Sequence, residues 1–361
     1  MSNGYYTKNR YAVRFRLRAE NLGGRIVISE LLKFSLFGGA NPIDVLAKPL
    51  DESEWNALFD ESRRQAVTAL TYDAIMKLPK EQRPPRSVLF HFASMTQTIR
   101  TDNNHRETVL ACFAEKVNEE LGIDTVVVKG SSIGRLYPEP MHRECGDNDI
   151  LTGVDTDRVS RLFEDIVPID RKDPRHDSLA FDGVMFELHR WLLYHGDDPD
   201  WTPVTMDDSL HLQHLPLEQE AFFIAKHIEH HSVFFHHRLR LRDLVDWSML
   251  VTAQGFDRKK FNELKRGTDV EVFAELMTAY CARIFGINVG ENDLRGLQPD
   301  DLEKIYMHCP ERHRLAVVRV ALRSWHYMRY ARKYRRIYGQ SMFRRFYINN
   351  LKIAIKQNLK P

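Results

Sequence analysis

Apolar side chains recur about every three to four residues through the first third of the chain, the spacing of an amphipathic helix. These positions include Trp55, Leu58, Phe59, Ala66, Leu70 and Ile75. Asp51 stands before them as a candidate N-cap. The prolines Pro84 and Pro85 interrupt the pattern, and a second amphipathic stretch follows over about 87–121. We therefore predict a helical subdomain over residues 26–116.

The pattern then changes to short alternating elements. The β-branched run Thr125–Val128 predicts a strand, and residues 131–137 predict a short helix. A second strand is expected at 147–152. Residues 155–167 carry apolar side chains at helical spacing, so a second helix should follow it.

A tight β-hairpin is predicted at Asp182-Gly183, which stands between two apolar runs. In the strand after this turn, one alternating set is Val184, Phe186 and Leu188, and the other is Met185, Glu187 and His189. We expect the apolar set to pack inward and Glu187 and His189 to project together from the opposite face. Together these strands and helices predict a compact α/β unit over 117–200.

Helical spacing returns after Asp200. Runs over about 218–251, 257–285 and 301–337 predict helices, and the first is either one long helix or two in tandem. The C-terminal part, 201–361, is therefore expected to be a second helical subdomain. The predicted fold class is α+β, with a small mixed-sheet core embedded between N-terminal and C-terminal helical subdomains.

Charge is unevenly distributed, although the formal net charge is only +2. Residues 311–361 hold 14 Lys and Arg against one Glu, so the rest of the chain carries about −11. Residues 1–25 are also basic and are predicted to be a poorly ordered extension. An anionic partner, nucleic acid among them, would fit the C-terminal segment. We favour instead a basic amphipathic helix that covers the core.

The composition, 43% hydrophobic and 28% charged, is that of an ordinary globular protein. Four cysteines are scattered without a CxxC pair, which predicts a reduced, cytoplasmic setting. No uncharged apolar run approaches the roughly 18 residues of a membrane span. We also expect no signal peptide, because the N-terminus lacks a compact apolar segment before a small-residue cleavage site. The oligomeric state stays open.

A cluster of carboxylates is the strongest chemical signal. Asp147 and Asp149 are one residue apart on a predicted strand, so both project from one face. Adjacent carboxylates repel each other unless a cation lies between them. If the hairpin strand neighbours this strand, Glu187 becomes a third acid. Three acids can hold two Mg²⁺ (or Mn²⁺) ions about 3.5–4 Å apart for in-line displacement at phosphorus.

A Gly-Ser turn stands upstream of these acids. Gly130, Ser131 and Ser132 begin the short helix, where glycine lets the backbone approach a phosphate and free N–H groups attract anions. Lys129 and Arg143 add a point charge and a bidentate fork for phosphate oxygens. We predict that these residues bind the phosphates of a nucleotide.

Histidines and arginines follow on the next helical stretch. His227 and His231 are four residues apart, as in metal-binding helices, but no HExxH motif is formed. We therefore predict structural or solvated histidines rather than a zinc site. Arg240 either reaches the nucleotide or forms an ion pair with Asp243 or Asp246.

Taken together, these motifs resemble the bacterial uncharacterised nucleotidyltransferase family, within the superfamily that includes DNA polymerase beta. The segments that carry the resemblance are KGSSIGRLYPEP, RECGDNDIL, FELH and RLRLRDLVDW. The resemblance covers about 30–300. It implies a nucleotidyltransferase core with a phosphate turn at Gly130 and Ser131. It also implies metal-binding aspartates at Asp147 and Asp149, and an acid at Glu187 that helps to activate an acceptor hydroxyl.

Other positions match the family less specifically. Lys129, Arg143 and His189 correspond to recurrent family positions, and Arg240 with Asp246 corresponds to its helical motif. Asn148 departs from the pattern, because the family usually has an apolar residue between the aspartates. A buried amide needs hydrogen-bond partners, so we expect this departure to leave the acids intact but to weaken the local packing of the strand.

The resemblance implies Mg²⁺-dependent transfer of a nucleoside monophosphate from a nucleoside triphosphate, ATP among them, to a hydroxyl acceptor that the sequence does not identify. Two alternatives stay open. One is a non-catalytic nucleotide-binding scaffold of the same fold. The other is a glycosyltransferase that uses Asp-x-Asp and a nucleotide sugar, although such enzymes place this motif after a larger nucleotide-binding domain.

Overall fold

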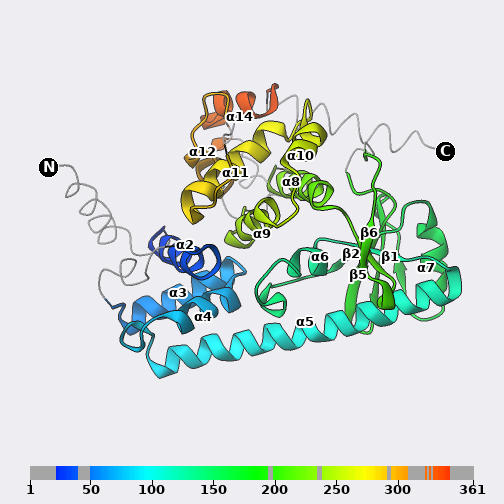
Figure 1. Cartoon of the computed structure of the whole chain (residues 1–361), viewed down its shortest axis with the longest axis horizontal. Coiled ribbons are helices and arrows are strands. Elements are labelled where there is room, and N and C mark those ends of the chain that lie inside the picture. The colour runs from blue at the N-terminus through cyan, green and yellow to red at the C-terminus, as the bar shows by residue number, and fades with distance from the viewer. Residues whose placement is uncertain are drawn as a thin grey trace.

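The computed structural model of the protein confirms the predicted α+β class, with helices around a mixed sheet (Figure 1). It describes residues 22–39, 49–193, 198–233, 238–290, 294–307, 322, 325–326 and 328–341. Within these ranges, every helix is too short or too polar to traverse a bilayer. The basic extension up to residue 21 and most of the basic segment 311–361 lie outside them.

The N-terminal part is helical, as its pattern predicts. It contains α2 (Leu22–Phe37), α3 (Glu52–Arg64), α4 (Thr68–Lys77), the 3-10 turn η2 (Lys80–Gln82) and α5 (Arg86–Leu121). Asp51 is the N-cap of α3: its carboxylate accepts the N–H of Glu54, and the Glu54 carboxylate accepts the N–H of Asp51. The predicted extension ends too late, because α2 already begins at Leu22.

The sheet has seven strands among the described residues, in the order β3-β4-β5-β2-β1-β7-β6. They are β1 (Thr125–Val128), β2 (Asn148–Leu151), β3 (Ile169–Asp170), β4 (His176–Phe181), β5 (Val184–His189), β6 (Val204–Asp207) and β7 (Leu212–His214). β2 runs antiparallel to β1 and parallel to β5. The two strands predicted at 125–128 and 147–152 are therefore confirmed as central neighbours.

The predicted hairpin joins β4 to β5. Asp182 and Gly183 have φ values of 46° and 75°. Positive φ at both central residues is the geometry of a type I′ turn, whose twist matches that of the flanking strands. The turn sets the register that places His176 opposite His189 and Ser178 opposite Glu187.

The prediction of helix directly after Asp200 is wrong. The chain forms β6, the 3-10 turn η5 (Asp208–Leu210) and β7 before the first helix begins. β7 pairs in parallel with β1, so tertiary pairing outweighs the local pattern of a three-residue strand. The histidine-rich run is two helices, α8 (Leu217–Val233) and α9 (Leu241–Thr252).

The two faces of the sheet are covered differently. α5 and α7 (Thr156–Glu164) cover one face, where the Phe113 ring stacks 4.7 Å from Phe163 and 4.4 Å from Phe186 between ring centroids. Figure 1 shows α5 reaching from the N-terminal helices to the sheet. On the other face, Val126 and Val128 of β1 belong to the large hydrophobic core that also includes residues of α8 and α9. Asp149 and Glu187 therefore lie on the face opposite the α5 contact.

The remaining described elements are η3 (Pro140–His142), η4 (Gly153–Asp155), α6 (Gly130–Gly134), α10 (Arg258–Lys265), α11 (Glu271–Phe285), α12 (Asp300–Leu302), the π-helical turn η6 (Glu303–Met307) and α14 (Ala331–Tyr338). α11 fits the predicted helical run 257–285. α12, η6 and α14 fit the described parts of 301–337.

Candidate active site

Three carboxylates converge where β2 lies beside β5. Asp147 directly precedes β2, and Asp149 pairs in register with Glu187 on β5. One carboxylate oxygen from each residue lies within 4.8 Å of the others. Asp149 is buried, Glu187 is half-buried, and Asp147 is the most exposed of the three. The expectation that the hairpin strand brings Glu187 to the aspartates is confirmed by this register.

Asp149 is held by two neighbours, the Lys129 ammonium and the His189 imidazole. Its Oδ2 lies 2.6 Å from Lys129 Nζ, and its Oδ1 lies 3.0 Å from His189 Nε2. Burial alone would raise the pKa of Asp149. The Lys129 ammonium and the His189 imidazole outweigh burial and hold that pKa well below its usual range. Asp149 is therefore an anion at neutral pH, whatever else binds beside it.

Glu187 is also an anion. Its Oε2 lies 3.4 Å from His189 Nε2, and its Oε1 lies 3.7 Å from His176 Nε2. Burial raises the pKa of Glu187, but the hydrogen bond from His189 and the nearby imidazoles lower it by more. For His189 the balance is opposite: burial lowers its pKa, and the contacts with Asp149 and Glu187 raise it overall.

The Gly-Ser turn has an unusual backbone and carboxylate partners. Lys129 has φ 58°, which costs a non-glycine residue about 1–3 kcal/mol. Its backbone N–H donates to Glu220 Oε1 at 2.6 Å, and Ser132 Oγ donates to Glu220 Oε2 at 2.9 Å. Ser131 Oγ donates to Glu107. Both serine hydroxyls thus meet acids from α5 and α8, and their part in phosphate binding stays a prediction.

Replacing Glu220 with glutamine should stabilise the protein at alkaline pH. Burial raises the pKa of Glu220 to about 7, and the bonds from Lys129 and Ser132 offset this only in part. A carboxyl whose pKa rises on folding contributes stability below its unfolded pKa, and that contribution is lost as the pH rises through about 7. In thermal unfolding of the full chain, we expect the Tm advantage of Glu220→Gln over wild type to grow between about pH 5 and pH 8.

The expected growth is about 2–4 °C for each kcal/mol of ionisation cost that the glutamine removes. Glu263→Gln, on an exposed position of α10, is the matched control and should track the wild type at both pH values. A Glu220→Gln curve that stays parallel to the wild type would contradict the buried, neutral form of Glu220.

Arg143 serves a structural ion pair. Its Nε and Nη2 donate to the two carboxylate oxygens of Asp246 at 2.7 and 2.8 Å, and both side chains are buried. The Tyr137 hydroxyl donates to the same carboxylate at 2.5 Å. The remaining nitrogen, Nη1, contacts the Gly130 carbonyl at 3.4 Å and Cys145 Sγ at 2.9 Å. The bidentate fork predicted for phosphate is thus engaged by Asp246, and it joins α9 to the Gly-Ser turn.

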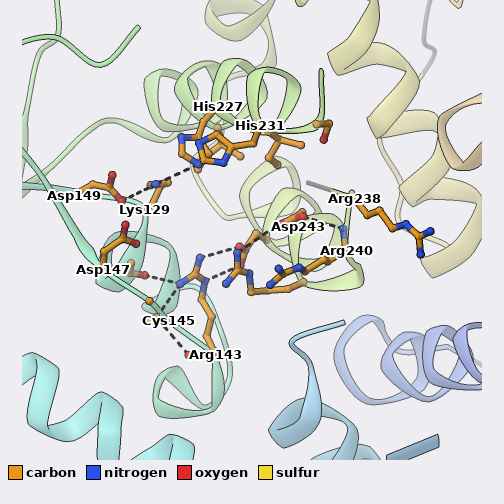
Figure 2. Close-up of a pocket in the computed structure, with 17 residues that line it drawn as sticks. Lys129, Arg143, Cys145, Asp147, Asp149, His227, His231, Arg238, Arg240 and Asp243 are labelled. Carbon is orange, nitrogen blue, oxygen red and sulfur yellow. Dashed lines mark hydrogen bonds and ion pairs between the residues drawn. The ribbon is translucent and has the colours of Figure 1, made fainter. Parts of the chain in front are cut away.

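A pocket opens between the carboxylates and the helices α8 and α9. Figure 2 shows Asp147, Asp149 and Lys129 on one side of it and Arg240 with Asp243 on the other. Its volume is about 140 Å³, and about 790 Å³ with the open mouth included. The enclosed volume of about 140 Å³ is smaller than the roughly 300–1,000 Å³ typical of small-molecule sites. Of the predicted residues, those that line the pocket are Lys129, Gly130, Arg143, Asp147, Asp149 and Arg240.

The histidines of α8 form the roof of this pocket. The His227 and His231 rings stack with centroids 4.0 Å apart, and Lys129 Nζ lies 3.3 Å from His227 Nε2. Burial, together with the positive charge of Lys129, holds the pKa of His227 well below its usual value. A neutral His227 next to Lys129 agrees with the predicted structural role. His236 and His237 lie outside the described residues.

The residue between the aspartates, Asn148, is a buried amide without hydrogen-bond partners among the described residues. Asn148 is fully buried, and neither its amide nitrogen nor its amide oxygen has a hydrogen-bond partner among the described residues. The departure from the family pattern at this position therefore leaves a buried amide unsatisfied within the described part of the chain. An unpaired buried amide costs about 1–3 kcal/mol. This departure does not displace Asp147 or Asp149 from the carboxylate cluster.

Sequence reasoning did not identify Glu107, Glu220 or His176 as neighbours of the site. For Glu220 a signal exists: it precedes Ile224 and His227 by four and seven residues, so it shares their helical face. An acid on the buried face of a helix needs a partner. Glu107 and His176 have no comparable local signal, because they reach the site from α5 and β4 through the tertiary fold.

Comparison with known proteins gives one finding that covers this site. A family model described as an uncharacterised nucleotidyltransferase matches residues 51–286. The matched span includes every residue of the carboxylate cluster, the Gly-Ser turn and the pocket. Searches of curated proteins and of solved structures found no match.

Proposed function

Because the chain belongs to the uncharacterised nucleotidyltransferase family, we propose that it moves a nucleoside monophosphate from a nucleoside triphosphate to a hydroxyl acceptor. The observation that carries this proposal is the convergence of Asp147, Asp149 and Glu187 at the edge of a pocket lined by five Lys or Arg and four Asp side chains. The chain reaches this arrangement with acids from two adjacent strands, and Lys129 and Arg240 line the same pocket.

The three acids fit a divalent ion of the magnesium class. They offer oxygen atoms only, within 4.8 Å of one another, and the pKa values of Asp149 and Glu187 are lowered so that both are anions. Asp147, Asp149 and Glu187 would hold Mg²⁺ or Mn²⁺. When bound, such an ion neutralises negative charge that develops on the phosphate oxygens.

The cationic side of the pocket is proposed to bind the phosphates. Lys129 and Asp149 both line the pocket, with Lys129 Nζ 2.6 Å from the Asp149 carboxylate, and Arg240 is exposed at the opposite rim. Ile224 and Ile228 of α8 add apolar surface. Contact of the phosphates with the Gly-Ser turn requires the Ser131 hydroxyl to leave Glu107. Arg143 positions this turn through Asp246 rather than touching the nucleotide.

In the proposed reaction, the acceptor oxygen forms a bond to the α-phosphorus of the nucleotide. The bond from that phosphorus to the α–β bridging oxygen breaks, and pyrophosphate leaves with the electron pair. The proton of the acceptor hydroxyl passes to solvent. Since the pKa of Glu187 is lowered, its carboxylate is a weak base, and we assign it to orienting the acceptor rather than to holding the proton.

Calorimetry with ATP, GTP, CTP and UTP, each with and without Mg²⁺, tests the proposal. We expect at least one nucleotide to bind, and to bind at least about tenfold more tightly with the metal. The double variant Asp147→Ala with Asp149→Ala should lose that metal dependence, because two of three oxygen ligands are gone. The proposal would be wrong if nucleotide affinity in the wild type did not depend on the metal, or if the double variant kept the wild-type metal dependence.

One set of contacts favours a second candidate, a nucleotide-binding scaffold without catalysis. Lys129 Nζ is bonded to Asp149 at 2.6 Å, and Glu107 and Glu220 occupy the hydroxyls of the Gly-Ser turn. A protein that only senses nucleotides can keep such contacts. Pyrophosphate release separates the two: stable binding with no release across a panel of hydroxyl acceptors would favour the scaffold.

The glycosyltransferase alternative has less support. The Asp-x-Asp strand pairs antiparallel with β1, within a mixed sheet, and only a short helix and turns lie between them. That arrangement differs from a large parallel nucleotide-binding sheet. Turnover of a UDP-sugar without pyrophosphate release would favour the glycosyltransferase alternative.

A further inference from the structure

A second ligand cluster lies directly beside the three carboxylates, on the hairpin strands. His176 of β4 stands opposite His189 of β5, and Glu187 is two residues from His189 on the same face. One ligand atom from each of the three side chains lies within 4.8 Å of the others. The imidazole centroids are 5.0 Å apart. Both imidazoles direct Nε2 toward the Glu187 carboxylate.

The chemistry of this cluster differs from that of its neighbour. Two imidazoles and one carboxylate favour zinc, manganese, cobalt or iron over magnesium, which prefers oxygen atoms alone. Asp147, Asp149 and Glu187 offer oxygen only. The two clusters share Glu187, and His189 contacts a carboxylate from each, Asp149 at 3.0 Å and Glu187 at 3.4 Å.

The surroundings of the two imidazoles also point to a ligand. His176 and His189 are more than nine-tenths buried, and the Nδ1 atoms of both lack a hydrogen-bond partner among the described residues. Asp173 Oδ2 lies 3.9 Å from His176 Nδ1, and Arg175 holds that carboxylate in place. At 3.9 Å this carboxylate does not yet accept a hydrogen bond from Nδ1, but it lies on the side where metal-bound histidines usually have a carboxylate as outer partner.

We propose that His176, Glu187 and His189 bind one divalent transition-metal ion, of the zinc or manganese class, next to the proposed nucleotide site. This site is distinct from the oxygen-only cluster because it includes His176, which does not line the nucleotide pocket. A bound ion would draw Glu187 and His189 together and so set the position of an acid that both clusters use. The proposal does not depend on transfer activity.

Cobalt titration of the full-length protein tests the site, because Co²⁺ bound by imidazoles absorbs visible light. The protein is first treated with chelator and then titrated in excess Mg²⁺, which occupies oxygen-only sites, and without nucleotide. We expect one equivalent of Co²⁺ per chain, with a visible band. His176→Ala should weaken Co²⁺ binding by at least about tenfold and remove that band.

Two variants serve as matched controls. Asp147→Asn removes an acid of the neighbouring cluster, and His91→Ala removes an exposed histidine of α5; both should keep the band and the affinity. If His176→Ala does not fold, His176→Gln is used instead. X-ray absorption of the Co²⁺-loaded wild type then counts the imidazole ligands directly. Two imidazole ligands in the wild type support the proposal. Fewer than two, or a His176 variant that binds Co²⁺ like the wild type, overturn it.

The cobalt titration distinguishes this proposal from the proposed function. It is carried out without nucleotide and measures metal binding, whereas the test of the function measures nucleotide affinity in Mg²⁺. Absence of imidazole-bound Co²⁺ would leave His176 as a residue that only orders Glu187, and Mg²⁺-dependent nucleotide binding would stand.

Discussion

Asp149→Asn should reduce the rate of pyrophosphate release by at least about a thousandfold, on the order of 4 kcal/mol of transition-state stabilisation. Asparagine has the size of aspartate and can still meet Lys129 and His189, so the fold should survive. It lacks the negative charge that those two side chains stabilise and that a divalent ion requires. The measurement is steady-state pyrophosphate release with the nucleotide that binds most tightly.

Without metal, Asp149→Asn should not weaken nucleotide binding, although it lowers the reaction rate. With residue 149 neutral, Lys129 loses its carboxylate partner, so the pocket attracts the triphosphate at least as well as in the wild type. A collapse of the site would instead weaken metal-free binding. Asp60→Asn, on the exposed surface of α3, should match the wild type in both assays. A rate within tenfold of wild type for Asp149→Asn would remove Asp149 from the proposed chemistry.

Asp246→Ala should lower the free energy of unfolding by about 3–5 kcal/mol, because it leaves the buried Arg143 guanidinium without its counter-ion. The loss includes the hydrogen bond from Tyr137. Arg143→Met together with Asp246→Leu should recover most of it, since neither charge then remains buried and unpaired. Urea denaturation of the full chain, compared at unchanged slope, measures the effect.

An exposed pair provides the control for this series. Arg158 Nη1 lies 2.7 Å from Asp155 Oδ1, but more than half of the Arg158 side chain is exposed. Arg158→Ala should cost less than about 1 kcal/mol. If Asp246→Ala costs no more than Arg158→Ala, then Asp246 does not hold α9 to the Gly-Ser turn through Arg143.

Local features of the sequence were sufficient to predict much of the site. The β-branched run 125–128 is β1, and Asp182-Gly183 is the hairpin turn. The alternation of Glu187 and His189 with Phe186 and Leu188 put the polar pair on one face. Side-chain alternation and turn geometry depend only on neighbouring residues, and so they can be predicted from the sequence.

Partners far apart in the chain were not predictable in the same way. The expected phosphate ligand Arg143 is paired with Asp246, which is 103 residues away, and Ser132 is paired with Glu220, 88 residues away. The strand β7 forms because it meets β1, which no pattern over 201–216 encodes. Each of these groups has many candidate partners in the sequence. Which partner it meets is decided by burial in the packed fold.

The sequence by itself determined that Glu187 shares a face with His189, since residues two apart on a strand point to the same side, and it predicted the same for Asp147, which directly precedes β2, and Asp149. Only the tertiary structure decided that β2 and β5 are parallel neighbours, which brings those faces together with Asp149 opposite Glu187. It also decided that Lys129 compensates Asp149, whereas Arg143 compensates Asp246. The physical reason is that a buried charge must meet an opposite charge at hydrogen-bonding distance, and only the folded chain sets which charges are that close.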